Sequence, residues 1–287
     1  MSAQSYGTPG DTVAAGVIGL GMIGGGVARN IAAAGLPLTV YDIRHDAADR
    51  LEGVDAPLGS PADVARASDV VLVSVVDAEQ VREVLAGEHG LLGAGKQGLV
   101  VLLLSTVALS AVREFAALCA GHGATLLDAG VTQAGDGKLV TMVGGPAEVV
   151  DRVRPALDAF SKAVVHCGPV GSGMVTKIAR NVVTYASWAV VREATSMAVR
   201  AGVDPERLIE VLDKAVTGGT DPLFLLRDHL DAEGVIRRQA ACIEALAQKD
   251  LAAAQELGQE IGLGTPLVDT VRPWMSAVLD GRYEGSA

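Results

Sequence analysis

Apolar and polar positions along the first part of the chain predict strands that are each followed by a helix. Val13 to Ile18 is a short apolar run typical of a buried strand. Met22 to Ala34 carries apolar residues at helical spacing until Gly35 and Pro37 end the pattern. A second strand is expected over Leu38 to Tyr41. Strands that alternate with helices predict an α/β domain with a parallel sheet.

The same alternation continues to about residue 168. Further helices are expected at Ala47 to Glu52, Ala78 to Leu85, Leu109 to Gly121, and between Pro146 and Phe160. Further strands are expected at Val70 to Val76, Leu99 to Leu104, Thr125 to Leu127, Leu139 to Val143, and Val164 to Cys167. The α/β domain is therefore predicted to span residues 13–168. Residues 1–12 form a Gly/Ser/Thr/Pro-rich stretch that we interpret as a loose tail and not as a signal peptide.

The pattern changes at Met174. From Met174 to Ala201 the chain has no proline or glycine, and apolar residues cover most of the helical circumference. A helix of about 28 residues spans roughly 42 Å, and one that is apolar on most sides needs burial by more than its own domain, most simply by a second subunit. Further helices are expected at Asp204 to Lys214, Pro222 to Asp231, Gln239 to Gly258, and Leu267 to Leu279. Residues 169–287 are thus predicted to be all-helical.

Length and charge narrow the class of protein. A chain of 287 residues favours about two domains. Its 34 acidic and 23 basic residues give a formal net charge of −11, which argues against nucleic acid or an anionic membrane as a partner. Charge or glycine interrupts every apolar stretch before it reaches spanning length. Three cysteines without a C-x-x-C pair predict buried thiols in a reducing, cytoplasmic compartment and no metal site.

A G-x-G-x-x-G pattern stands where the first strand turns into the first helix. In such a turn Gly19 permits the tight bend, Gly21 lets the backbone approach a pyrophosphate, and Gly24 lets the helix pack on the strand. Asp42 follows about 20 residues later, where an acid accepts hydrogen bonds from the adenosine ribose and favours NAD over NADP. Arg44 leaves NADP open, because it can hold a 2′-phosphate. A glycine-rich structural turn without a ligand is the alternative.

Residues at the carboxyl ends of the predicted strands complete the cofactor site. Ligands of such sheets bind at these ends, so Val75, Val76, Ser105 and Thr106 are expected to face the cofactor. Strand core is the alternative for the two valines. The predicted cofactor-binding residues are Gly19, Leu20, Gly21, Met22, Ile23, Gly24, Asp42, Ile43, Arg44, Val75, Val76 and Thr106.

Two polar residues stand on the otherwise apolar long helix. Lys177 and Asn181 are four residues apart and share one face. A lysine beside a nicotinamide can take the proton of an alcohol while its carbon gives up a hydride, and an amide can orient the substrate oxygen. This role needs a lowered pKa, which burial or a second cation such as Lys249 would provide. The alternative is a surface lysine at a helix end.

Four blocks in order resemble the β-hydroxyacid dehydrogenases, the group that contains 3-hydroxyisobutyrate dehydrogenase and tartronate semialdehyde reductase. They are Gly19 to Asn30, Asp69 to Val81, Asp128 to Gly145, and the G-x-G-x-x-x-K-x-x-x-N of Gly171 to Asn181. The resemblance implies an α/β Rossmann-type domain joined by a long helix to an all-α substrate and dimerisation domain. It implies that Lys177 is the catalytic acid or base and that Asn181 binds substrate. Lys249, in a K-D-L segment, is implied to reach the cofactor and substrate, and the assembly to be a homodimer or homotetramer.

One block departs from the family pattern. Where the family has D-A-P-V-S-G-G and a longer loop, this chain has Asp128-Ala129-Gly130-Val131-Thr132-Gln133-Ala134 and a shortened loop. Thr132 keeps a hydroxyl, but Gln133 and Ala134 replace the glycines whose amides approach a substrate carboxylate in relatives. Either these side chains alter the acid that is bound, or the backbone path is unchanged and nothing is lost. Thr132, Gln133 and Ala134 are predicted to bind substrate with Asn181 and Lys249.

The leading hypothesis is an NAD-dependent oxidoreductase that acts on a small 3-hydroxy acid or its aldehyde, with Lys177 as the acid or base. An imine reductase of the same superfamily is one rival, although such relatives generally replace the lysine and prefer NADPH. A catalytically silent dinucleotide-binding protein is the other, and the altered Thr132 to Ala134 segment permits it.

Overall fold

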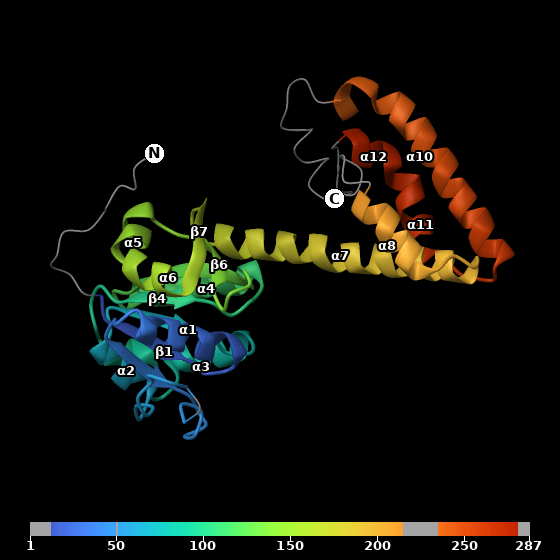
Figure 1. Ribbon diagram of the computed structural model, residues 1–287. Coiled ribbons are helices and arrows are strands. Elements are labelled where there is room, and N and C mark those ends of the chain that lie inside the picture. The colour runs from blue at the N-terminus through green and yellow to red at the C-terminus, as the bar shows by residue number, and fades with distance from the viewer. Residues whose placement is uncertain (1–12, 50, 215–234, 281–287) are drawn as a thin grey trace, which may run out of the picture. The chain divides into compact units, whose positions relative to one another are not determined.

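The computed structural model of the protein describes residues 13–49, 51–214 and 235–280. It contains two compact units, one ending at Arg180 and the other beginning at Asn181 (Figure 1). The helix expected at Pro222 to Asp231 lies outside the described residues. Within the described ranges, no helix is both long and apolar enough to cross a bilayer.

The first unit is built on one seven-stranded sheet with the spatial order β2-β1-β3-β4-β5-β6-β7. Its strands are β1 (Ala15–Ile18), β2 (Leu38–Tyr41), β3 (Val70–Val73), β4 (Val100–Leu103), β5 (Thr125–Gln133), β6 (Leu139–Gly144) and β7 (Ser161–Gly168). Strands β1 to β5 run parallel, as expected. The expectation is wrong for β6, which runs antiparallel to β5, while β7 runs parallel to β6. The cause is a direct hairpin between β5 and β6, which needs no crossover helix.

Helices cover both faces of this sheet and enclose two apolar cores. They are α1 (Met22–Ala33), α2 (Pro61–Ala67), α3 (Ala78–Ala86), η1 (Leu91–Ala94), α4 (Leu109–Gly121), α5 (Ala147–Arg152) and α6 (Arg154–Phe160). Ile31 of α1 and Phe160 of α6 belong to one core. Leu85 of α3 and Phe115 of α4 belong to the other, with Met174. Because both sheet faces are covered, the parallel strands are continuous apolar runs.

Local structure differs from the expectation at three places. The helix expected near Ala47 to Glu52 is wrong over its described residues, which form turns: the amides of Ala47, Asp49 and Leu51 each donate to a carbonyl three residues earlier. The strand expected over Val70 to Val76 ends at Val73. Helix α2 is absent from the expected elements, although Ser60 caps it by accepting from the Asp63 amide, and Pro61 opens it. Both are helix-start signals, and the short apolar pattern of seven residues conceals them.

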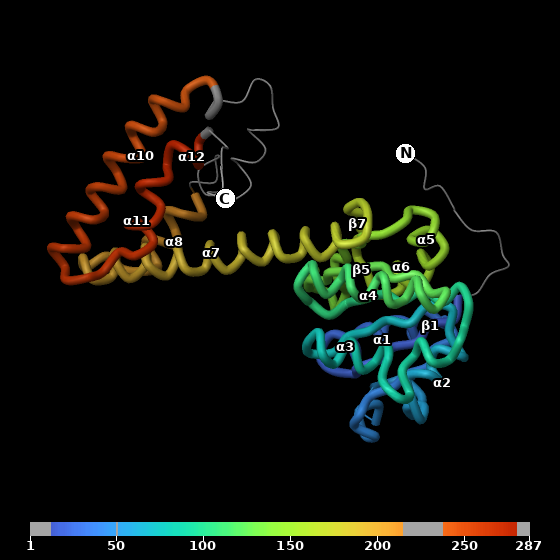
Figure 2. The backbone as a smooth tube through the Cα atoms, turned by 180° about the vertical axis from the view of Figure 1, so that it is seen from behind, coloured from blue at the N-terminus to red at the C-terminus, as the bar shows by residue number. Residues whose placement is uncertain are grey.

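The second unit is helical throughout its described residues. Helix α7 (Ser172–Arg200) runs through the boundary between the units and is followed by α8 (Pro205–Lys214), α10 (Val235–Glu260), α11 (Pro266–Val271), η2 (Arg272–Trp274) and α12 (Met275–Asp280). Helices α10 and α12 lie side by side (Figure 2). The single helix expected from Leu267 to Leu279 is instead three short ones, because Pro273 lacks the amide that a continuous helix requires.

Among the residues that the structure describes, the long helix carries large apolar side chains that are exposed, and its expected burial by a second subunit stays a prediction. Val182, Tyr185 and Trp188 of α7 are 62%, 57% and 66% exposed. Tyr185 and Trp188 contact each other edge to face, with ring centroids 5.4 Å apart. Large apolar side chains at helical spacing therefore line a face of α7 that is exposed in the described part of the chain.

Candidate active site

The glycine-rich turn has the shape that a pyrophosphate needs. Gly19 adopts a left-handed φ of +89°, and a Cβ there would collide with the Ser74 carbonyl. A Cβ on Gly24 would collide with the Gly19 carbonyl, so only glycine lets α1 pack this closely. A Cβ on Gly21 would meet no atom within 4 Å. Gly21 also precedes α1 without a side-chain cap, which leaves the helix N-terminus open toward a ligand.

Exposed apolar side chains follow the carboxyl ends of β1, β2 and β3. Met22, Ile43 and Val76 are 84%, 83% and 82% exposed. Strand core is therefore the wrong interpretation for Val76, while Val75 is half-buried. Isolated large apolar groups at the ligand-binding edge of such a sheet fit the flat faces of a dinucleotide. The glycine turn and this apolar edge together fit NAD.

The two polar residues after β4 have different surroundings. Thr106 is exposed, whereas Ser105 is only 5% exposed. The Ser105 hydroxyl accepts from the Val75 amide at 2.9 Å and donates to the Val75 carbonyl at 2.8 Å. The expectation that Ser105 faces the cofactor is wrong, because its side chain ties the end of β4 to the end of β3.

Asp42 follows β2 and is only 7% exposed. Its Oδ2 accepts from the Leu20 amide at 2.7 Å, and its Oδ1 accepts from the Arg44 amide at 2.9 Å and from Arg44 Nε at 3.0 Å. Burial raises the pKa of Asp42, but the hydrogen bonds from Arg44 and Leu20 outweigh burial and hold the pKa below its usual value. Asp42 is therefore ionised and fixed beside the glycine-rich turn.

A buried carboxylate, Asp128, fastens the end of β5 to the start of α7. Asp128 has no exposed surface, and its two oxygens accept from the amides of Gly171 and Met174, each at 2.6 Å. A carboxylate at a helix N-terminus satisfies unpaired amides and favours the helix dipole. Sequence reasoning missed this role, although an acid directly after the apolar residues Leu126 and Leu127 signals it.

Two glycines let α7 lie directly against the sheet. A Cβ on Gly130 of β5 would collide with the Cβ of Lys177, and a Cβ on Gly173 would lie 2.6 Å from the Asp128 carbonyl oxygen. Such contacts are too short for any side chain. Gly173, the second glycine of the G-x-G motif, therefore allows α7 to pack closely on the sheet. This packing places Lys177 against β5.

Lys177 is half-buried, and its Cβ lies against Gly130 of β5. Burial lowers the pKa of Lys177, and the positive charge of Arg180 lowers that pKa further. Lys249, the cation expected to act here, lies on α10 in the second unit, with its Nζ 3.5 Å from a carboxylate oxygen of Asp250. Its role stays a prediction. Asn181 follows Lys177 by one helical turn of α7 and is also half-buried.

The expected substrate segment divides between the two faces of β5. Strand β5 extends to Gln133, six residues beyond the predicted end. Side chains alternate along a strand, so Thr132 shares the face of Asp128 and Gly130, both of which contact α7. Gln133 lies on the opposite face with Val131, which packs in the core of α1. Ala134 begins the turn, where its amide donates to the Lys138 carbonyl.

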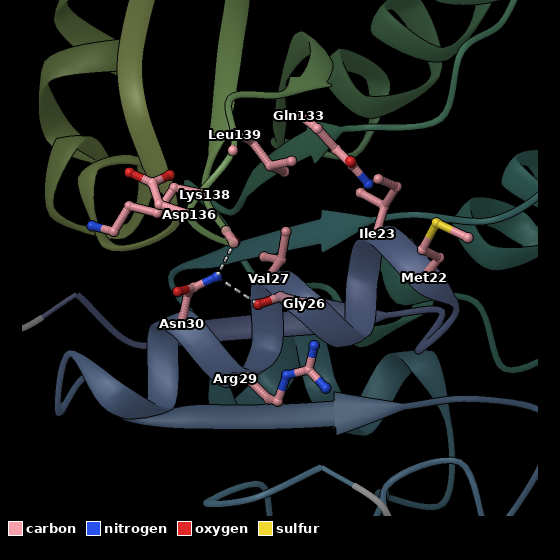
Figure 3. A pocket seen from close by; sticks show the side chains of 12 residues that line it. Met22, Ile23, Gly26, Val27, Arg29, Asn30, Gln133, Asp136, Lys138 and Leu139 are labelled. Atoms are coloured by element: carbon pink, nitrogen blue, oxygen red, sulfur yellow. Dashed lines mark hydrogen bonds between the residues drawn. The ribbon is translucent and has the colours of Figure 1, made fainter.

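A pocket of about 280 Å³ lies between α1 and the β5–β6 hairpin. Gln133 points into it from the hairpin toward Ile23 of α1, and Leu139 faces Val27 (Figure 3). Asn30 closes one end by donating to the carbonyl oxygens of Gly26 at 2.9 Å and Gly137 at 3.1 Å. The shortened loop is thus a closed hairpin held on the cofactor-binding helix.

The three cysteines differ in exposure. Cys119 is buried, and burial raises the pKa of its thiol to about 12. Cys167 is half-buried and Cys242 is exposed, so the expectation of three buried thiols is wrong for these two. Cys242 lies on α10, outside the two apolar cores described above.

Comparison with known proteins matches both halves of the chain. The NAD binding domain of 6-phosphogluconate dehydrogenase matches residues 14–168, and the NAD-binding domain of NADP-dependent 3-hydroxyisobutyrate dehydrogenase matches residues 171–286. A probable 3-hydroxyisobutyrate dehydrogenase of Dictyostelium discoideum is 34% identical over 69% of this chain, which spans 63% of that relative's length. An NAD-dependent L-serine dehydrogenase of Pseudomonas aeruginosa is 30% identical over 87% of each chain.

Solved structures agree on the fold. A protein from Mycobacterium avium 104 is 33% identical, with a TM-score of 0.78 over 93% of this chain and 98% of that one. An imine reductase from Streptomyces aurantiacus has the same TM-score over 93% of this chain and 95% of its own, but only 20% identity. The second likeness shows the shared fold alone.

Proposed function

Because the chain belongs to the β-hydroxyacid dehydrogenase family, we propose that it transfers a hydride between NAD and the hydroxyl-bearing carbon of a small 3-hydroxy acid or its aldehyde. Bound NAD accepts or supplies the hydride. Gly19, Gly21 and Gly24 would hold the pyrophosphate, and Asp42 would take the adenosine ribose. Lys177 would take the hydroxyl proton at Nζ during oxidation and return it during reduction.

The position of Lys177 is the observation that carries this proposal. Asp128 holds the start of α7, Gly130 lets Lys177 approach β5, and burial with Arg180 lowers the pKa of Lys177. A lysine with a lowered pKa exchanges protons more readily near neutral pH than an exposed one. The retained lysine and its setting favour a dehydrogenase over the imine reductase and silent-protein alternatives.

Replacement of Lys177 by alanine tests the proposal. We expect Lys177→Ala to bind NADH with unchanged affinity and to lose turnover by about 10²- to 10⁴-fold, the range for loss of a general acid or base. Lys214→Ala is the matched control, because Lys214 is an exposed lysine on α8. Undiminished turnover in Lys177→Ala would contradict the role of Lys177.

We propose that the substrate binds along β5 just beyond Gly130, the residue against which Lys177 packs. Thr132 lies on the α7 face and would donate to a substrate oxygen, with Asn181 as a second contact. Gln133, Ala134 and Lys249 would shape the remainder of the site. A screen of 3-hydroxy acids, their aldehydes and cyclic imines with NAD and NADP measures this directly. Turnover of imines alone would favour the imine reductase alternative.

The uncovered face of α7 supports assembly through the helical unit, which we propose to be the substrate and dimerisation domain of a homodimer or homotetramer. Ile178, Val182, Tyr185 and Trp188 recur at helical spacing and are all exposed. Light scattering should give at least twice the 29.3 kDa chain mass, and Val182→Glu should reduce it. A monomer at micromolar concentration would contradict this proposal.

A cytoplasmic location also stays a proposal, which cell fractionation tests.

A further inference from the structure

Two cationic residues stand one turn apart on the same face of α7. Arg180 follows Lys177 by three residues, and this spacing brings the Cβ atoms of a helix to roughly 5–6 Å of each other. Lys177 is half-buried, whereas Arg180 is exposed. Like charges at this spacing repel each other, so the pair costs free energy while no anion lies beside it.

The charge of Arg180 acts on Lys177 in the structure. Burial is the larger cause that lowers the pKa of Lys177, and the positive charge of Arg180 is the second. Asp128, the carboxylate at the start of α7, is already engaged, because it has no exposed surface and both its oxygens accept from main-chain amides. An anion that binds beside the two cations would relieve their repulsion.

The spacing of the two cations matches that of the two polar groups in a 3-hydroxy acid. In such an acid the carboxyl carbon is two bonds from the carbon that bears the hydroxyl. When the hydroxyl lies at Nζ of Lys177, the carboxylate is within reach of a long side chain one helical turn away. The guanidinium of Arg180 has a fork of N–H donors that matches the two oxygens of a carboxylate.

Strand β5, which lies against α7, offers weaker donors to a carboxylate. Thr132 contributes one neutral hydroxyl on the face toward α7. Gln133 points into the pocket on the α1 face, and the amide of Ala134 donates to the Lys138 carbonyl at 3.0 Å. A hydrogen bond from a charged donor is stronger than one from a neutral hydroxyl, so the arrangement favours Arg180 as the anchor of the acid group.

We propose that Arg180 binds the carboxylate of the substrate and thereby selects acids over neutral alcohols. The inference rests on the proposed function for the position of the substrate hydroxyl at Lys177. An acid is then expected to bind the NADH-loaded protein more tightly than its neutral ester does. Added salt should weaken the binding of the acid and leave that of the ester unchanged, because only the acid is attracted by charge.

Binding to the complex with NADH tests this inference without turnover, because an alcohol does not react with NADH. The full chain saturated with NADH is titrated with 3-hydroxypropionate and with its methyl ester, and nicotinamide fluorescence gives a Kd for each. Arg180→Gln should weaken the acid by at least about tenfold, the size of a lost hydrogen bond to a charged group, and should change the ester by less than about twofold. Arg180→Lys keeps the charge without the fork and should lose less. Arg113→Gln, which removes an exposed arginine from α4, is the control and should change neither Kd.

Two results would overturn the inference. One is a wild-type complex that binds the acid no more tightly than the ester, which includes a complex that binds neither. The other is an equal loss of acid and ester in Arg180→Gln with an unchanged Kd for NADH, which would mean that Arg180 only supports α7. Failure of the proposed function is distinguishable, because it appears as absent turnover by wild type, whereas failure of this inference appears in the Kd values.

Discussion

The cofactor end of the first unit and the end where we propose that substrate binds, here called the substrate end, are organised in different ways. At the cofactor end, Gly19, Gly24 and Asp42 stand within one strand–helix–strand segment, and each serves the geometry of that segment. At the substrate end, Asp128 and Gly130 of β5 position Lys177, which lies more than 40 residues later on α7. The first arrangement is local, whereas the second exists only when two distant elements meet.

Gly130→Ala should lower kcat without changing cofactor binding, and we expect its effect to be the largest of those predicted here. The added Cβ would collide with Lys177 and push α7 away from β5. A displacement of about 1 Å from the reacting position can cost 10²-fold in rate, so we expect kcat to fall by about 10²-fold or more. The Kd for NADH should stay within about twofold, because no cofactor contact changes.

Gly121→Ala is the matched control for this variant. Gly121 ends α4, and a Cβ added there would meet no atom within 4 Å, so alanine should be tolerated with unchanged kcat. Equal losses of kcat and of NADH affinity in Gly130→Ala would contradict the claim that the substrate end can be altered without affecting cofactor binding.

Asp42→Ala should weaken cofactor binding and leave the catalytic step almost unchanged. Without the carboxylate the ribose hydroxyls of NAD lose their acceptor, while Arg44 remains available to a 2′-phosphate. We expect the KM for NAD to rise by about tenfold and to rise less for NADP, with kcat at saturating cofactor almost unchanged. Steady-state kinetics with both cofactors measure this. An equal rise for NAD and NADP would contradict the acceptor role of Asp42.

The difference between the two ends also explains what could be predicted from the sequence. The fold class, the glycine-rich turn and Asp42 follow rules about neighbouring residues, and the structure places them as expected. The antiparallel hairpin of β5 and β6 does not follow from such rules, because the apolar pattern that predicts β5 ends at Leu127. The position of Asp128 after an apolar strand signals a special role, but its partners Gly171 and Met174 do not follow from neighbouring residues, since both are more than 40 residues away.

The orientation of the Ser105 side chain is a further feature that could not be predicted from neighbouring residues in the sequence. A hydroxyl after an apolar strand indicates a ligand-facing position, and Thr106 is exposed in agreement with that rule. Ser105 instead bonds to the main chain of Val75, at the exit of the neighbouring strand. Which of two adjacent hydroxyls meets the ligand depends on the register of β3 and β4, and that register is a tertiary property.

Substitutions of Thr132 and Gln133 compare the two faces of β5, and we expect them to have the smallest effects of those predicted here. Thr132 shares the Lys177 face of β5, whereas Gln133 points into the pocket on the α1 face (Figure 3). Thr132→Val should raise the substrate KM by several-fold through one lost hydrogen bond, and Gln133→Ala should raise it less. A larger effect of Gln133→Ala would place the substrate on the α1 face.

The pH dependence of kcat in both reaction directions tests the role of Lys177 most directly. Oxidation needs the neutral amine and reduction needs the ammonium ion. Because burial and then Arg180 lower the pKa of Lys177, oxidation should rise with pH and level off below the pH at which an exposed lysine titrates. Reduction should fall over the same range, and Lys177→Ala should lose both slopes. The same pH dependence in both directions, or slopes that persist in Lys177→Ala, would contradict proton exchange by Lys177.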